Sequence, residues 1–246
     1  MDPKTLTDEI FFADSDLDLA QARRRLEDGL DGADDGELFL ERRTSESLAF
    51  DDGQLRTANH DVSQGFGMRA VAGEFAAYAH GGDLTDAALA RAAETAREAG
   101  KGRGGELADG PSPVNRRLYG HEDPTQTPGF ASKVGVLEQI DAYLRAKDPA
   151  VVQVSASISA ELQAVKILRA DGQEASDLRP PVRVNVQVTG QRGARMETGS
   201  DGRGGPVPHA RRPVDSASPE SAAEAHRQAL AKREAGPAPA WGAPGR

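Results

Sequence analysis

Residues 37–82 alternate between apolar and polar side chains, with turn signals at two places. Asp52-Gly53 and Ala72-Gly73 are the kinds of residue pair that join neighbouring antiparallel strands. Alternation with a period of two is typical of strands that bury one face and expose the other. We therefore predict a hairpin formed by residues 37–43 and 45–53, followed by strands at 54–73 and 74–82.

The rest of the chain adds more strands and helices. Alternation predicts strands at 150–160, 161–172 and 180–190. Apolar residues at helical spacing predict a helix capped by Asp16 or Asp18 and ending near Gly29, a second at 83–99, and a third capped by Ser132. The fold class is α+β, with two antiparallel or mixed sheet segments, each preceded by a helix, and with the helices packed on one face.

The domain organisation follows from shifts in composition. Residues 1–36 form an N-terminal helix and an acidic loop, 37–190 form the α+β domain, and 191–246 form a tail rich in glycine, proline and arginine. Residues 100–130 form a long connection. Within the tail we predict one helix at 219–234, and we expect residues 199–217 and 236–246 to be poorly ordered.

Composition limits the function classes. The chain has no cysteine, which excludes disulfides and thiolate chemistry. Its net charge of −9 argues against nucleic-acid binding, since phosphate repels an acidic surface. No stretch approaches the roughly 18 apolar residues of a membrane span, and the acidic N-terminus does not resemble a secretory signal. We therefore expect a cytoplasmic protein with neither nucleic-acid nor membrane partners.

We find no catalytic, cofactor-binding or metal-binding residues in the sequence. No histidine has another within four residues, as a helical zinc pair requires; the five are His60, His80, His121, His209 and His226. No serine, including Ser45, Ser47, Ser63 and Ser155, has a nucleophile-elbow setting.

Three glycine-rich stretches lack the features of phosphate-binding loops. Residues 64–70, QGFGMRA, lack the third glycine of a dinucleotide fingerprint and precede a strand, so Gly65 and Gly67 are read as glycines that slim a strand. Residues 100–105, GKGRGG, are read as a helix end running into a loop. Residues 199–205, GSDGRGG, are either a loop or a backbone contact to a peptide or partner.

Several segments together resemble the TldD/PmbA family of zinc metalloproteases, on its TldD branch. The resemblance covers residues 20–205. Its markers are Gly53, then Gly65, Gly67 and Arg69 in a Gly-x-Gly-x-Arg strand, the Asp-x-Arg-Pro element at Asp177–Pro180, and the run at 199–205.

The resemblance implies that this chain is the N-terminal, non-catalytic region of such a protease. It would contribute to subunit assembly and to the guidance of unfolded peptide substrates. Zinc would sit in a C-terminal half that this chain does not contain, and the partner would be a PmbA-like (TldE-like) subunit in a heterodimer. Activity of this chain as an enzyme is left open, with inactivity expected for the chain alone. The alternatives are a stand-alone protein-binding module and a nonfunctional truncated fragment.

Overall fold

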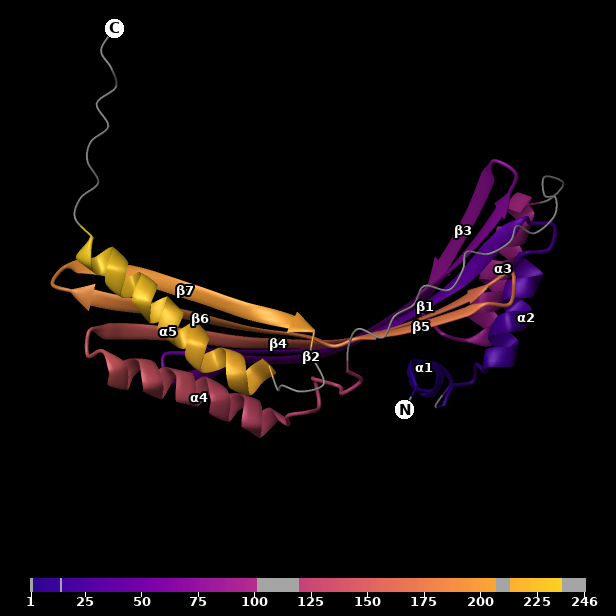
Figure 1. The fold of residues 1–246 in the computed structure, drawn as a ribbon. Coiled ribbons are helices and arrows are strands. Elements are labelled where there is room, and N and C mark those ends of the chain that lie inside the picture. The colour runs from indigo at the N-terminus through magenta and orange to yellow at the C-terminus, as the bar shows by residue number, and fades with distance from the viewer. Residues whose placement is uncertain (1, 14, 101–119, 207–212, 236–246) are drawn as a thin grey trace, which may run out of the picture.

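The computed structural model describes residues 2–13, 15–100, 120–206 and 213–235, without the side chains of 99–100 and 206–218 (Figure 1). Its described part holds one seven-stranded sheet and five helices. The strands are β1 (Asp35–Asp51), β2 (Gln54–Ala72), β3 (Phe75–Gly81), β4 (Val151–Arg169), β5 (Glu174–Arg179), β6 (Pro181–Arg192) and β7 (Arg195–Pro206). The helices are α1 (Pro3–Phe12), α2 (Leu19–Gly29), α3 (Asp86–Gly100), α4 (Phe130–Lys147) and α5 (Pro213–Glu234). The predicted α+β class is confirmed.

All strand pairs in the sheet are antiparallel, in the order β3-β2-β1-β4-β6-β7. Strand β4 is long enough to pair β6 over Val151–Ala160 and β5 over Gln163–Leu168, so β5 and β6 lie in line along the same side of it. The two predicted sheet segments are therefore one sheet, joined by the ladder between β1 and β4.

The predicted hairpin of 37–43 and 45–53 is wrong, because both segments belong to the single strand β1. No turn residue stands between them; Arg42, Arg43 and Thr44 interrupt only the apolar alternation. The interruption has a physical cause. Leu38 and Leu40 of β1 belong to one hydrophobic cluster, and Leu48 and Phe50 belong to another. The residues between these pairs belong to neither cluster, so they need not be apolar. The same error divides β4, which runs unbroken where two strands were predicted at 150–160 and 161–172.

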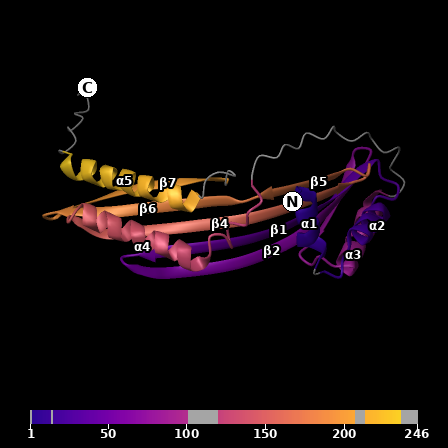
Figure 2. The same ribbon diagram turned by 60° about the horizontal axis from the view of Figure 1, so that its bottom comes forward.

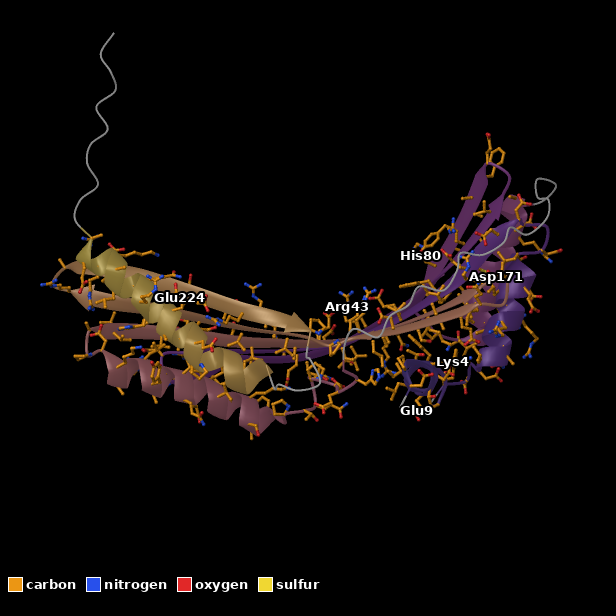
Figure 3. The ribbon with its side chains drawn as sticks, viewed as in Figure 1. Lys4, Glu9, Arg43, His80, Asp171 and Glu224 are labelled. Carbon is orange, nitrogen blue, oxygen red and sulfur yellow. The ribbon has the colours of Figure 1, made fainter. Side chains whose placement is uncertain are left out.

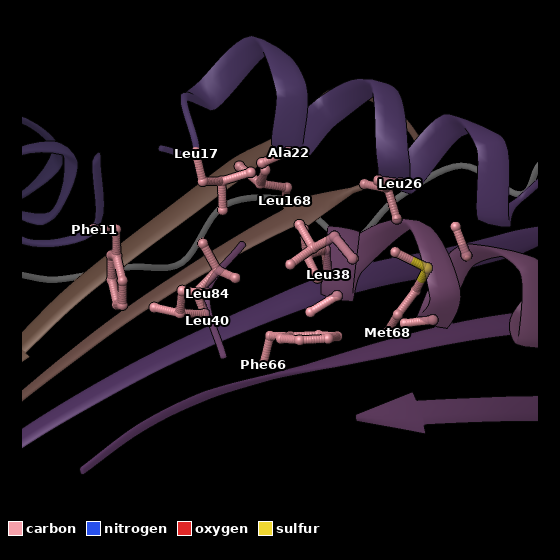
Figure 4. Packing of buried hydrophobic residues seen from close by; sticks show 14 of the residues in the cluster. Phe11, Leu17, Ala22, Leu26, Leu38, Leu40, Phe66, Met68, Leu84 and Leu168 are labelled. Atoms are coloured by element: carbon pink, nitrogen blue, oxygen red, sulfur yellow. The ribbon is translucent and has the colours of Figure 1, made fainter. Parts of the chain in front are cut away.

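The helices cover one face of the sheet, as predicted, in two groups (Figures 1 and 2). Helices α1, α2 and α3 pack on one end around a cluster that includes Leu38, Leu40 and Leu168, part of which is shown in Figure 4. Helices α4 and α5 pack on the other end around Leu48, Phe50 and the valines of β6. Apart from Val151, which precedes a register shift in β4, the β1 and β4 residues in the two clusters have even numbers, so they point to the same side.

A buried charge lies between the two clusters. The Lys133 side chain of α4 is fully buried; its Nζ contacts a Glu46 carboxylate oxygen on β1 and donates to the carbonyl oxygen of Thr125 at 2.8 Å. A buried ammonium is tolerated because it is paired and hydrogen-bonded. This contact fixes the start of α4 to the middle of β1.

The helix predictions hold in part. Asp18 caps α2, and a capping box with Gln21 is present. Helix α4 begins after Gly129 rather than at a Ser132 cap, and α5 begins at Pro213, ahead of the predicted 219. No helix in the described part of the chain is both long and apolar enough to span a membrane.

The expectation of poor order at 199–217 is wrong where the structure can test it. Residues 199–206 belong to β7, which pairs β6 throughout, and 213–217 belong to α5. The glycines at 199–205 resemble a loop in the sequence because loops are rich in glycine. In the structure, Gly199 allows α5 to pack directly on β7. A Cβ at this position would lie 2.0 Å from the carbonyl oxygen of Ala225. Residues 207–212 and 236–246, like 101–119 of the predicted long connection, lie outside the described residues.

Candidate functional site on the uncovered face of the sheet

The face of the sheet opposite the helices carries a long polar surface, here called the open face. Odd-numbered residues of β1 and β4 point to this side, and polar side chains dominate it: Ser45, Ser47, Ser155, Ser157, Ser159, Glu161 and Gln163. The ribbon bends so that this side is concave in Figure 3, with Arg43 near its centre. Since neither hydrophobic cluster uses these residues, their polarity is not explained by packing.

Three hollows follow one another along the open face. The central hollow, of about 580 Å³, spans five strands, with Ser47 of β1, Asp61 of β2, Ser159 of β4, Arg183 of β6 and Gly204 of β7 in its lining. The aromatic hollow, of about 330 Å³, lies toward β3. The distal hollow, of about 470 Å³, lies toward β7. Together they make a surface several strands wide that is open to solvent.

Acidic groups outnumber basic ones where the central and aromatic hollows meet. Arg43 Nη2 lies 2.9 Å from Glu41 Oε1, and Arg43 Nε lies 3.5 Å from Glu161 Oε1, so two carboxylates share one guanidinium. Gln163 Nε2 also donates to Glu41 Oε1 at 2.9 Å. Asp61 forms no ion pair with any described residue. The local charge therefore stays negative.

The aromatic hollow explains the glycine pair at 65 and 67. A Cβ on Gly67 would lie 2.4 Å from the hydroxyl of Tyr78, so the tyrosine ring lies against the bare backbone of β2. The Tyr78 and His80 rings stack with centroids 5.6 Å apart. Phe39, Glu41, Arg43 and Gly65 also line the hollow. The prediction that these glycines slim a strand is confirmed: the Tyr78 ring lies against Gly67, and the backbone of Gly81 lies against Gly65.

The distal hollow is held by hydrogen bonds across strands. Ser155 donates to Asp51, as does Gln153 Nε2 at 3.2 Å, and these bonds lower the pKa of the Asp51 carboxyl. Arg183 Nε donates to Asn185 Oδ1 at 2.8 Å and has no carboxylate partner among the described residues. A Cβ at Gly202 would lie 2.5 Å from that same Asn185 oxygen. The run at 199–205 thus serves the α5 contact on one face and this network on the other.

Strand β2 also borders the open face with a free edge. Its residues 66–72 pair β3, whereas no strand in the described chain pairs residues 54–65 on the side away from β1. Residues 56–64 are all exposed. A sheet edge of this kind presents main-chain N–H and C=O groups that can pair with another extended chain.

The structure disperses the histidines. His60 is exposed on β2, His80 stacks on Tyr78, and His226 of α5 contacts Asp148 Oδ2 at 3.1 Å, while His209 lies outside the described residues. In the described ranges, no group of three or more His, Cys, Asp or Glu side chains is arranged to hold a metal ion. The described residues therefore do not fit a zinc site.

The remaining marker residues of the resemblance have structural roles. Arg69 pairs with Glu37 at 3.1 Å, Asp177 pairs with Arg179 at 2.7 Å, and Gly53 turns the chain with φ of 76°. Sequence reasoning missed the polar residues of the open face. The available signal was the run of Ser, Asn, Asp and Arg at odd positions, which alone does not tell which face the helices leave uncovered.

Comparison with known proteins agrees with this architecture. Residues 36–100 match a family model described as PmbA/TldA metallopeptidase domain 1, and residues 123–233 match one described as the central domain of the same metallopeptidases. A TldD homologue of Haemophilus influenzae, described as a metalloprotease, is 31% identical over 176 residues. One of Buchnera aphidicola subspecies Schizaphis graminum is 26% identical over 172 residues. Each alignment covers 70% of this chain and 36% of the relative.

Solved structures share the fold at low sequence identity. A Thermotoga maritima protein described as a proposed modulator of a DNA gyrase aligns with a TM-score of 0.69 at 14% identity, over 86% of this chain and 48% of that one. TldE from Thermococcus kodakarensis aligns with a TM-score of 0.66 at 14% identity, over 85% of this chain and 47% of that one.

Proposed function

Because this chain belongs to the TldD/PmbA metallopeptidase family, we propose that it is a non-catalytic region of such an enzyme, which holds extended, unfolded peptides. The single observation that carries the proposal is the open face, a polar surface hollowed across five strands and left free by every described helix. A peptide on this surface would hydrogen-bond to serine and asparagine side chains. Its main chain would pair with the free edge of β2 at 54–65.

The chemistry of the open face suits unfolded chains of varied sequence. Hydroxyl and amide groups donate and accept hydrogen bonds alike, so they satisfy peptide N–H and C=O groups whatever side chains follow. Pairing at a strand edge uses main-chain atoms, which every peptide has. The surface therefore favours extended conformation over a particular sequence.

In this proposal, peptide bonds are cleaved by another domain of the family's proteins and not by this region. The chain spans 36% of the length of the curated relatives it matches, and its described residues supply no metal-binding group. We include in the proposal a zinc-bearing further domain, a PmbA-like or TldE-like partner subunit, and a cytoplasmic location. The shared fold with TldE supports the choice of partner, because related subunits of one fold commonly assemble through equivalent surfaces.

The test is to fill the central hollow. Ser159→Trp places an indole on its floor, where Ser159 is exposed, and Gln139→Trp places the same group on the exposed side of α4. Binding of a fluorescein-labelled, unstructured peptide of alternating serine and asparagine is followed by fluorescence anisotropy. We expect Ser159→Trp to weaken binding at least fivefold and Gln139→Trp to leave it unchanged.

Two results would contradict the proposal. Equal effects of the two tryptophans would place the peptide outside the central hollow. No binding to the unsubstituted chain at peptide concentrations up to the millimolar range would remove the peptide-holding role. Assembly is tested separately, by size-exclusion chromatography of the chain mixed with a TldE-like subunit, where an unshifted elution volume would exclude that partner.

A further inference from the structure

We infer that the aromatic hollow binds the positively charged side chain of an arginine or lysine in the bound peptide. This inference rests on the proposed function, because it assigns a side-chain preference to one part of the open face. It depends on three features found together: an exposed aromatic pair, a glycine floor and an excess of carboxylates.

The aromatic pair is offered to solvent rather than buried. Tyr78 is 64% exposed, the largest exposed fraction among the large hydrophobic residues at the described surface. The β2 and β3 registers place Tyr78 and His80 on the open face, whereas Phe75 of the same strand points to the other side. A ring in this position presents a negative π surface, which attracts a cation within about 6 Å of its centre.

The floor of the hollow is shaped to keep the ring in place. Gly67 lies beneath Tyr78, and Gly65 lies one step further along β2, next to Glu41 across the ladder. A Cβ at Gly65 would lie 2.9 Å from the carbonyl oxygen of Gly81. Both glycines therefore let β3 lie close against β2, and the hollow lined by Tyr78 and Glu41 keeps a volume of about 330 Å³, enough for a guanidinium or ammonium group.

The charge at the hollow is complementary to a cation. Glu41 and Arg43 both line it, and Arg43 also pairs with Glu161 of the neighbouring central hollow, so these three groups together carry one uncompensated negative charge. Asp61, which forms no ion pair with any described residue, lines the neighbouring central hollow. A carboxylate and an aromatic face on opposite sides of one hollow suit a guanidinium, which hydrogen-bonds in its plane and stacks through its faces.

Other occupants fit less well. An anionic side chain would be repelled by the same carboxylates. An aliphatic side chain could contact Phe39 and the Tyr78 ring, but it would offer no hydrogen-bonding group to the Glu41 carboxylate in the same lining. A neutral aromatic side chain remains as the competing occupant that the experiment separates.

The experiment uses one serine-asparagine host peptide with a single central residue changed. That residue is arginine, its neutral isostere citrulline, or phenylalanine, and affinities for the full chain are measured by fluorescence anisotropy at low ionic strength. We expect the arginine peptide to bind about fivefold to tenfold more tightly than the citrulline peptide. Raising the salt concentration should reduce the difference, since the contact is partly ionic.

Paired variants locate the effect. Tyr78→Leu and Glu41→Gln should each bring the arginine-to-citrulline ratio close to one. Their matched controls are Phe75→Leu, an exposed aromatic on the other face of β3, and Glu74→Gln, an exposed carboxylate in the turn before β3, which should preserve the ratio. All four proteins are first checked for an unchanged circular dichroism spectrum, so that loss of fold is not mistaken for loss of the site.

The outcomes separate this inference from the proposed function. Equal binding of arginine and citrulline peptides, or tighter binding of the phenylalanine peptide, would overturn the inference while the peptide-holding role stands. A ratio that the control variants abolish as strongly as Tyr78→Leu would also overturn it. Absence of binding for all three peptides would remove the proposed function, and the inference with it.

Discussion

Replacing Gly199 of β7 with alanine should push helix α5 away from the sheet. A Cβ at this position would lie 2.0 Å from the carbonyl oxygen of Ala225 and 2.5 Å from the backbone nitrogen of Ala229. Both obstacles are main-chain atoms of the helix, so no side-chain rotation can relieve the overlap. To restore an ordinary contact of 3.4 Å, the helix must move by roughly 1.4 Å, a large shift for a packed interior.

The cost follows from what the helix buries. Ala222, Ala225 and Ala229 are almost fully buried against the valine-rich side of β6, so a shift of the helix opens gaps along this whole contact. Overpacking of this kind costs about 1–3 kcal/mol in the free energy of unfolding. Taking about 2 kcal/mol, the melting temperature of a chain of this size should fall by roughly 4–8 °C.

The assay is urea unfolding followed by far-ultraviolet circular dichroism. The matched control is Gly205→Ala, on the same strand and the same face, where a Cβ would meet nothing within 4 Å. Because glycine in a strand costs about 0.5–1 kcal/mol relative to alanine, this control should be neutral or slightly more stable than the unsubstituted chain. Equal stability of the two variants would refute the reasoning, since it would mean that α5 does not rest on Gly199.

Two further predictions concern charged groups. Lys133→Met should lower the free energy of unfolding by about 3 kcal/mol, because it leaves Glu46 largely buried without its partner. Adding Glu46→Leu should recover part of this loss. A double variant that is no more stable than Lys133→Met in urea unfolding would contradict the prediction. The backbone N–H of Ala150 lowers the pKa of the Asp148 carboxyl, against the opposing effect of burial. A lowered pKa in the folded state stabilises the protein above the unfolded value near 4, and this contribution is lost as the pH falls through the folded pKa. Unfolding measured between pH 6 and pH 2 should therefore show a shallower acid loss for Asp148→Asn, and identical slopes would count against the assignment.

Local patterns predicted the elements whose signals lie within a few residues. The Asp18 cap, the turn at Gly53 and the regular alternation of β6 all act at short range, and the structure confirms them. Strand β5 was missed because its residues 174–179 are mostly polar and only partly buried. Helix α1 was missed in the acidic N-terminal segment, where Phe11 and Thr7 supply its few buried contacts.

Features that depend on distant contacts could not be predicted in this way. Strand β1 pairs β4 across more than 100 residues of chain. Only this pairing shows that the polar centre of β1 continues the strand and is not a turn. The open face has the same origin. Alternation shows that odd and even residues of a strand face opposite ways, but the packing of α1 to α5 decides which set stays uncovered.

The ladder between β1 and β4 also sets the order in which the chain can fold during synthesis. Strand β1 ends at Asp51, and β4 begins at Val151, so β1 emerges from the ribosome about 5–20 s before its partner at ordinary translation rates. During that interval β3 can already pair β2, whereas the edge of β1 that later pairs β4 has no partner, and the apolar residues that β1 shares with the second cluster lack β4 and β6. The nascent chain therefore passes through a stage in which another extended strand can pair with the edge of β1 that β4 later occupies.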